Sequence, residues 1–436
     1  MSRSQTLMEK SVEIAITGLG CVTPIGTGRE AFLSGLLAGK CAIQTVHQLT
    51  DQPLSTFRGA PIEDFSGKDF VRPRKALKVM SREVQLAYAS AQLAWQDSFP
   101  GEERPEPDRM GVVFGSEMIP GEIGDVIPAV QECINEGVLD VSQWGQKFGR
   151  QVFPLWMLKN LPNMPACHVG IAVDARGPNN SIAQEEVSGL LALCEAENVF
   201  RRKAADVMLV GAIGSRLTPT RLLYRLRQIY DQHPKADSLA DSLSGAAFGD
   251  ARGGIVPSEG AVTLVTETLE HAQAREAPIL GFVRGTASTF GRTSVDHGGS
   301  RRAIAQAVSA SIQAAGVAVE DLSHISAQGF AGPALDIEEA EGIRAAVGDQ
   351  VPVCVPSSYY GTAGAAAAPL HLAASLVALS GRQLLPAIGL NALDPACPVN
   401  VMRESRHTDK EHFVQVAFTP EGHASAAVIQ CASQTT

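Results

Sequence analysis

The sequence is poor in charged residues and has no long apolar run, and each absence excludes a class of protein. Charged residues make up 19% of the 436 residues, and the formal net charge is −10. A dedicated nucleic-acid-binding protein is therefore not expected, because such proteins present a basic surface. No run of 18 or more apolar residues is present, so we predict no membrane span. Residues 1–11 are polar and contain no apolar signal core, which predicts a cytoplasmic protein.

The usual sequence patterns of metal sites and disulfide frameworks are also missing. The eight cysteines are widely scattered and form no CxxC pair, which is typical of thiols kept reduced and buried as small apolar groups. The closest two of the ten histidines, His407 and His412, have a spacing that does not place both on one helical face. We therefore predict no metal site and no cofactor.

What is present is a globular, core-rich composition in which short apolar runs alternate with helical stretches. Hydrophobic residues make up 45% of the chain, whose length exceeds that of one ordinary domain. The alternation is typical of an α/β fold. We predict two units, residues 1–265 with an excursion at about 120–162, and residues 266–436. The expected strands include 12–17, 110–114, 206–210 and 351–355, and the expected helices include 81–95, 181–203 and 363–379.

Four segments carry a distinctive pattern, and their order and spacing matter more than any one of them. Residues 14–26 read IAITGLGCVTPIG, and residues 177–189 read GPNNSIAQEEVSG. Residues 248–261 contain an Arg-x-Gly-x-x-x-x-Glu-Gly-Ala pattern, and residues 327–339 contain Gly, Pro, Asp and Glu at motif spacing. Together they resemble the beta-ketoacyl-ACP synthase and polyketide ketosynthase family of the thiolase-like superfamily. The resemblance covers nearly the whole chain and implies a five-layered αβαβα fold of two related halves that forms an obligate dimer.

The resemblance also shows which catalytic positions have changed. Family members carry a nucleophilic cysteine at the buried N-terminus of a long helix, and the motif places Glu186 there. The positions of the two histidines, which stabilise charge during decarboxylation, are occupied by Gln328 and Thr362. A lysine that precedes the second histidine in the family is replaced by Ser357. Because neither glutamine nor threonine can carry a proton at neutral pH, the family's condensation is excluded by any shared mechanism.

The positions that hold and gate the substrate in the family have changed as well. The two threonines that hold the phosphopantetheine arm are replaced by Phe330 and Gly332. A glycine-rich loop that gates the pocket follows Phe418 in this alignment and contains Pro420 here. We expect these four residues to line or fill the remaining pocket.

Glu186 itself allows two interpretations. A carboxylate in the first turn of a helix is stabilised by unpaired backbone amides and the helix dipole, with Ser181 as the expected cap. The side chain would then be structural or would fill the pocket. Alternatively, Glu186 is buried beside Gln328 and acts as a general base in an unrelated reaction.

A cationic stretch also allows two interpretations. It is a solvated helix face, or it docks an acidic acyl carrier protein by charge complementarity, as similar surfaces do in the family. Its members are Arg72, Arg74, Lys75, Lys78 and Arg82.

Three functional hypotheses remain open from the sequence. The first is a non-condensing subunit that resembles a chain-length factor and forms a heterodimer with an active ketosynthase in type II fatty-acid or polyketide and polyene synthesis. The second is a repurposed acyl-thioester hydrolase, lyase or acyltransferase that uses Glu186 as base. The third is a homodimeric scaffold without catalytic duty.

Overall fold

The structure is a computed structural model, and it describes residues 12–47, 56–101, 104–117, 123–218, 220–222, 246–291 and 299–432. The statements below concern these residues. Within them, no helix combines the length and the apolar character needed to cross a bilayer.

The first half of the chain forms one side of a long mixed sheet. Its strands run in the order β1 (Ile14–Thr23), β10 (Glu259–Thr268), β9 (Val207–Ser215), β5 (Met110–Gly115) and β8 (Asn179–Ile182). The first three pair antiparallel, whereas β9, β5 and β8 pair parallel. Strands β1, β5 and β9 are buried along their whole length, as expected for strands covered on both faces.

The second half repeats this arrangement. The strand order is β11 (Gly281–Phe290), β18 (His423–Cys431), β17 (His412–Phe418), β12 (Leu322–Ser326), β13 (Pro352–Cys354) and β15 (Asn400–Val401). Again the first three strands pair antiparallel and the remainder pair parallel. A short antiparallel pairing between β1 and β11 joins the two halves into one continuous sheet.

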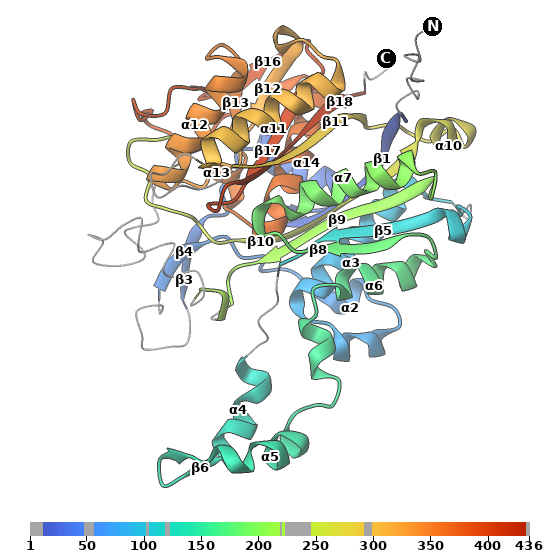
Figure 1. Cartoon of the computed structure of the whole chain (residues 1–436), viewed down its shortest axis with the longest axis vertical. Coiled ribbons are helices and arrows are strands. Elements are labelled where there is room, and N and C mark those ends of the chain that lie inside the picture. The colour runs from blue at the N-terminus through green and yellow to red at the C-terminus, as the bar shows by residue number, and fades with distance from the viewer. Residues whose placement is uncertain are drawn as a thin grey trace, which may run out of the picture.

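Helices cover both outer faces and fill the space between the two halves, which gives five layers (Figure 1). Helices α3 (Arg82–Ser98) and α6 (Met164–Val173) pack on the outer face of the first half. Helices α11 (Gly299–Ala315) and α12 (Pro333–Val347) cover the second half. The central layer contains α7 (Ser188–Arg201) and α14 (Ala367–Ser380). The predicted five-layered α/β fold is confirmed.

The helix expected over residues 181–203 is shorter than predicted. Residues Asn179–Ile182 form strand β8, which pairs with β5, and the helix begins only at Ser188. The prediction failed here because strand pairing decides the conformation of this short polar segment, and its polar residues carry no apolar strand signal.

Residues 123–160 form an arm that projects from the body of the molecule (Figure 1). The arm contains a small aromatic cluster in which Phe148 lies between Trp144 and Trp156, with ring centroids 5.1 and 5.6 Å away. Its elements are α4 (Ile123–Glu132), β6 (Ile134–Asn135), β7 (Val138–Leu139), η3 (Val141–Gln143), α5 (Trp144–Gln151) and η4 (Trp156–Asn160).

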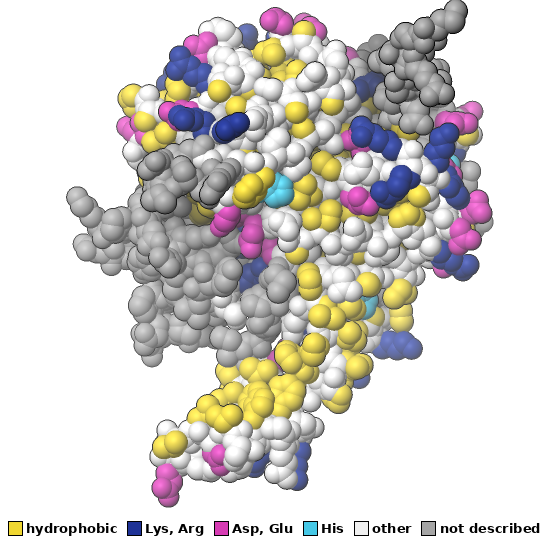
Figure 2. Space-filling view, in the orientation of Figure 1, with side chains coloured by type: hydrophobic (Ala, Val, Ile, Leu, Met, Phe, Trp, Pro, Cys, Tyr) yellow, Lys and Arg dark blue, Asp and Glu magenta, His cyan; other side chains and the backbone are white. Residues whose placement is uncertain are grey.

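The arm carries most of the apolar side chains that the described chain leaves exposed. Eight of the eleven exposed large hydrophobic residues lie in it, and Val138 and Val141 are 70% and 69% exposed. Figure 2 shows hydrophobic side chains as a yellow band along the arm. An exposed apolar patch of this kind is typical of a surface that contacts another protein, a membrane or a ligand.

The other described elements are shorter. They are β2 (Gly26–Thr27), α1 (Arg29–Leu37), β3 (Gln44–His47), β4 (Thr56–Gly59), α2 (Gly67–Phe70), η1 (Arg74–Val79), η2 (Pro107–Arg109), α10 (Leu269–Ala274), η6 (Val319–Asp321), α13 (Ser357–Tyr360), η7 (Gly364–Ala366), β14 (Gln383–Leu384) and β16 (Arg406–His407).

Candidate functional site

The turn between β8 and α7 places Glu186 in the interior of the protein. A single 3-10 turn, η5 (Glu185–Val187), precedes the helix, and Glu185 adopts a left-handed φ of 54°. The hydroxyl of Ser188 donates to the carbonyl of Glu185 at 2.6 Å and accepts from the amide of Gln184 at 2.8 Å, which closes the turn. Ser181 lies in β8 and does not cap the helix, so that prediction is wrong. Glu186 is 1% exposed.

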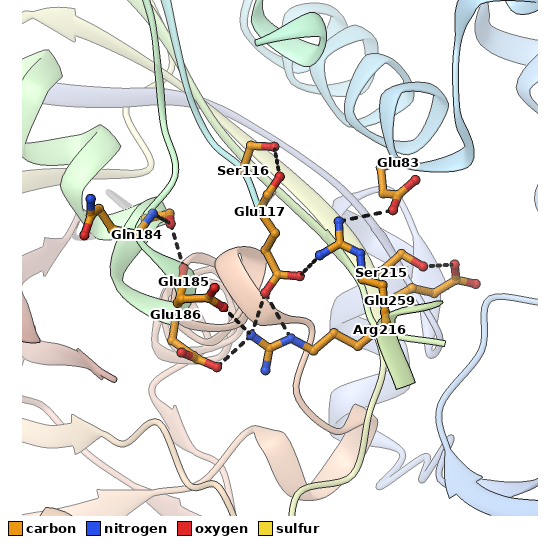
Figure 3. Close-up of polar contacts among 11 residues, drawn as sticks. Glu83, Ser116, Glu117, Gln184, Glu185, Glu186, Ser215, Arg216 and Glu259 are labelled. Carbon is orange, nitrogen blue, oxygen red and sulfur yellow. Dashed lines mark hydrogen bonds and ion pairs between the residues drawn. The ribbon is translucent and has the colours of Figure 1, made fainter. Parts of the chain in front are cut away.

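The carboxylate of Glu186 is held by a guanidinium (Figure 3). Arg216 Nη2 donates to Glu186 Oε1 at 2.6 Å and to Glu117 Oε1 at 2.5 Å, and its Nε donates to the same Glu117 oxygen at 3.0 Å. Glu117 also accepts from Arg221 at 2.7 Å, and Arg221 approaches Glu83 at 3.5 Å. These five side chains form one buried chain of alternating charge, which we call the ionic chain.

Secondary structure explains how the ionic chain is assembled. Glu117 lies just beyond β5, and Arg216 directly follows β9, the neighbouring parallel strand. Glu83 lies in the first turn of α3. The carboxyl ends of neighbouring parallel strands meet at one edge of a sheet, and this edge faces the turn that carries Glu186.

Burial and charge act in opposite directions on Arg216. Burial disfavours its charged form, but the carboxylates of Glu117 and Glu186 outweigh this effect and raise the pKa of Arg216 above its ordinary value. The packing around the pair is close. A Cβ added at Gly364, whose φ is +57°, would lie 2.2 Å from Glu117 Oε1 and 2.7 Å from Arg216 Nε. A glycine is therefore required beside the ionic chain.

Gln328 lies in the loop that follows β12. Its backbone amide and that of Gly329 donate to the two oxygens of Glu339 at 2.7 and 3.0 Å. Asp336 accepts from the amide of Phe248 at 2.8 Å. Asp336 and Glu339 therefore link α12 to two loops, the one that contains Phe248 and the one that contains Gln328 and Gly329. Burial raises the pKa of Asp336 to about 7 and that of Glu339 to about 8.

The other altered positions gather around one small cavity. Ser357 donates to the carbonyl of Gly329 at 2.8 Å, and the amide of Thr362 donates to the carbonyl of Val256 at 2.9 Å. Both residues, together with Phe330, line a pocket of about 150 Å³. The side chain of Gln328 is fully buried, and within the described structure neither of its amide atoms has a hydrogen-bond partner.

The expected gate residues do not all lie at this pocket. Phe330 packs edge-to-face against Phe418, with ring centroids 5.0 Å apart, and both are buried. Gly332 precedes the first residue of α12. Pro420 is half-buried in the turn after β17 and is not among the residues that line the pocket.

The cationic stretch divides into two parts in the structure. Arg82 forms a two-pronged ion pair with Glu259 at 2.7 and 2.8 Å, so its charge is already neutralised within the chain. Arg72 donates to the backbone carbonyls of Lys68 and Val71. The exposed cations of the η1 turn are Arg74, Lys75 and Lys78.

Sequence reasoning located Glu186 but missed its partners. A usable signal existed, because Glu117 and Arg216 stand two residues and one residue beyond buried, largely apolar strands, where a charged side chain reaches the sheet edge. Arg221 and Glu83 carry no comparable signal. Within the described residues, no group of three or more His, Cys, Asp or Glu side chains is arranged to hold a metal ion.

Two family descriptions match the chain in succession. "Beta-ketoacyl synthase, N-terminal domain" matches residues 11–272, and "Beta-ketoacyl synthase, C-terminal domain" matches residues 280–391. The chain belongs to the beta-ketoacyl synthase family. Among curated relatives, the 3-oxoacyl-[acyl-carrier-protein] synthase 2 of Staphylococcus aureus strain MRSA252 is 25% identical, over 97% of this chain and 99% of that protein. The enzyme of the same name from Coxiella burnetii is 29% identical, over 94% and 96% of the two chains.

Solved structures show the same fold at lower identity. The ishigamide ketosynthase/chain length factor superposes with a TM-score of 0.82 at 21% identity, covering 97% of this chain and 100% of that chain. A beta-ketoacyl synthase from Burkholderia phymatum STM815 gives 0.82 at 23% identity, with the same coverage. A complex described as AntDE:AntF, a type II PKS acyl-carrier protein with its ketosynthase bound to the hexaketide, gives 0.79 at 21% identity.

Proposed function

We propose that this chain is a non-condensing beta-ketoacyl synthase-like subunit that pairs with an active ketosynthase in type II fatty-acid or polyketide synthesis. The observation that carries the proposal is the buried ion pair between Glu186, at the position of the family's nucleophile, and Arg216. A group that carries an acyl chain must be free to attack a thioester. Here the carboxylate is engaged by a guanidinium.

The surroundings of Glu186 also count against an acyl intermediate. An acyl group attached at position 186 would begin beside the guanidinium of Arg216, with Glu117 directly behind it. Placing an alkyl chain there would separate buried charges from their partners, which is strongly unfavourable. The same ion pair disfavours the alternative in which Glu186 serves as a general base, because Arg216 occupies its Oε1 oxygen.

Two features of the surface support pairing with another chain of this fold. The arm exposes a band of apolar side chains that water solvates poorly. Among the described strands, β8 lies at the end of the sheet, and its first two residues, Asn179 and Asn180, are exposed. An open strand edge offers unpaired backbone groups to a partner strand. One structural neighbour is itself described as a ketosynthase/chain length factor.

Contact with an acyl carrier protein remains part of the proposal. Arg74, Lys75 and Lys78 form an exposed cationic turn on an otherwise acidic chain. Charge complementarity of this kind accelerates and orients the encounter with an acidic partner more than it adds affinity.

The proposal is tested by purification with and without a cysteine-bearing ketosynthase encoded nearby. Alone, the chain should show no malonyl-dependent elongation, and after co-expression the two chains should elute as a one-to-one complex. Elongation by the isolated chain, with every thiol blocked, would refute the proposal.

A matched pair of surface variants tests the role of the arm. Val138→Asp combined with Val141→Asp should weaken the complex about tenfold or more, because it puts charge into an apolar contact. Leu37→Asp is the control, since Leu37 is also exposed, at 58%, but lies on α1 outside the arm. If the arm variant and Leu37→Asp weaken the complex equally, the arm is not part of the interface.

A further inference from the structure

A second pocket, of about 270 Å³, lies between helices α1 and α14. It shares no lining residue with the pocket that contains Phe330, so it is separate from the altered catalytic positions. Its walls are aliphatic and come from α1, α14 and the segment that enters β11. The side chains that form them are Leu33, Ile279, Leu280, Leu376 and Val377. Walls of this kind favour a hydrocarbon group over water.

The volume of the pocket sets the size of the group that it can hold. An aliphatic cavity of about 150 Å³ holds one molecule of benzene. By the same measure, a pocket of about 270 Å³ has room for about ten carbon atoms. Leu37 lies one turn beyond Leu33 on α1 and is 58% exposed, so the apolar surface continues along this helix. We expect a linear alkyl chain to follow this surface.

The charged groups at the pocket carry an excess of negative charge. Arg29 lines the pocket and pairs with Asp97 at 3.2 Å. Glu30 also lines the pocket, is exposed, and has no ion pair within the described residues. Burial raises the pKa of Asp97, and the charge of Glu30 adds to this rise. Arg29 therefore does not compensate both carboxylates.

The C-terminal end of α14 adds to this negative potential. Val377 and Ser380 line the pocket from the last turn of the helix. The carbonyl groups at a helix C-terminus carry partial negative charge and attract cations. The last turn of α14 contains no basic side chain, so this charge is not compensated within the helix.

We propose that this pocket binds an amphiphile with a cationic head group and an alkyl chain of up to about ten carbon atoms. The chain fills the aliphatic cavity. The head group lies at the mouth, beside Glu30 and the end of α14. None of these residues occupies an altered catalytic position, so the inference does not rest on the proposed non-condensing function.

Calorimetric titration of the full chain with three octyl compounds tests the inference. Octylammonium, octanol and octanoate share one chain and differ in the charge of the head group. Octylammonium should bind with a Kd in the millimolar range or below, octanoate should bind several-fold more weakly, and octanol should lie between them. The inference is overturned if octylammonium does not bind, or if octanol or octanoate binds as tightly.

The variant Glu30→Gln separates the contribution of the head group from that of the chain. It should weaken octylammonium binding about two- to fivefold, as expected for an exposed charge, and leave octanol binding unchanged. The substitution is at the surface, so we expect the variant to fold. Glu270→Gln is the control, because Glu270 is an exposed carboxylate that lines a different pocket. Equal effects of Glu30→Gln on octylammonium and octanol would contradict the assigned head-group position.

The variant Leu33→Trp locates the alkyl chain. The larger side chain should occupy the cavity and weaken binding of octylammonium about tenfold or more. The arm variant Val138→Asp with Val141→Asp is the control, because the arm is the other exposed apolar surface to which an alkyl chain could bind. Unchanged affinity in Leu33→Trp that is folded by circular dichroism, or loss of affinity in the arm variant, would place the chain elsewhere. The Glu30→Gln measurement decides the question if Leu33→Trp does not fold.

Discussion

Replacing Arg216 with methionine should destabilise the protein severely while keeping most of the side-chain volume. Arg216 contacts two buried carboxylates, Glu186 at 2.6 Å and Glu117 at 2.5 Å, and all three side chains are at most 2% exposed. Removing one partner of a buried ion pair costs about 3–5 kcal/mol, because the remaining charge stays buried without compensation. We expect the free energy of unfolding to fall by at least that amount.

A second substitution at Glu186 should restore part of the stability that Arg216→Met loses. The double variant Arg216→Met with Glu186→Gln should be more stable than Arg216→Met alone, because it removes the buried charge that has lost its ion pair with Arg216, whereas Glu117 still pairs with Arg221. The coupling energy between the two positions should be about 1–3 kcal/mol, as for groups that share one network.

Guanidinium denaturation followed by circular dichroism measures these differences at one fixed protein concentration. The control is Arg176→Ala, which breaks an exposed pair with Asp174 and should leave the free energy of unfolding almost unchanged. A loss below about 1 kcal/mol for Arg216→Met, or no coupling with Glu186→Gln, would refute the assignment of Arg216 as the counter-ion of this site.

Three further predictions concern pH and activity. Arg275, His271 and Thr17 bind Glu267 against the cost of its burial and hold its pKa at about 2, below its ordinary 4.5, so the stability it contributes should be lost as pH falls from about 4.5 toward 2. Glu267→Gln should flatten that acid limb of the unfolding curve, and an unchanged acid limb would contradict this. Burial raises the pKa of Glu339 to about 8, so the free energy of unfolding should decrease as pH rises from about 4.5 to 8. Denaturation at several pH values checks this, and Glu339→Gln should reduce the slope. Finally, Glu186→Cys should not create elongation activity in a radiolabelled malonyl assay, because Gln328 and Thr362 still lack imidazole; measurable product would contradict this.

The α/β class could be predicted from the sequence, because apolar runs and helical stretches alternate in both halves, whereas the five layers were implied only by the resemblance to the ketosynthase family. The assignment of Glu186 to the nucleophile position rests on the 177–189 segment and stays a prediction. Even the spacing of Asp336 and Glu339 was informative, and the structure gives it a physical meaning: the pair accepts backbone amides from two loops.

Contacts between residues far apart in the chain could not be predicted from the sequence. Nothing local distinguishes Arg82, which pairs with Glu259, from the exposed Lys78 nearby, although they differ by only four positions in the chain. The partners of Glu186 come from separate elements, so only the sheet topology brings them together. The last two residues of β8, Ser181 and Ile182, were assigned to the helix because the pairing of β8 with β5 involves residues almost seventy positions apart.

Helix α14 belongs to the second half by sequence, yet it packs against strands of both halves. All residues from Ala367 to Leu379 are buried, and six of these thirteen are Ala or Ser. Splitting the polypeptide between β10 and β11 would therefore leave the N-terminal fragment without part of the layer that covers β10. Neither fragment is expected to be stable when expressed by itself, so the two halves, however similar in topology, form a single cooperative unit.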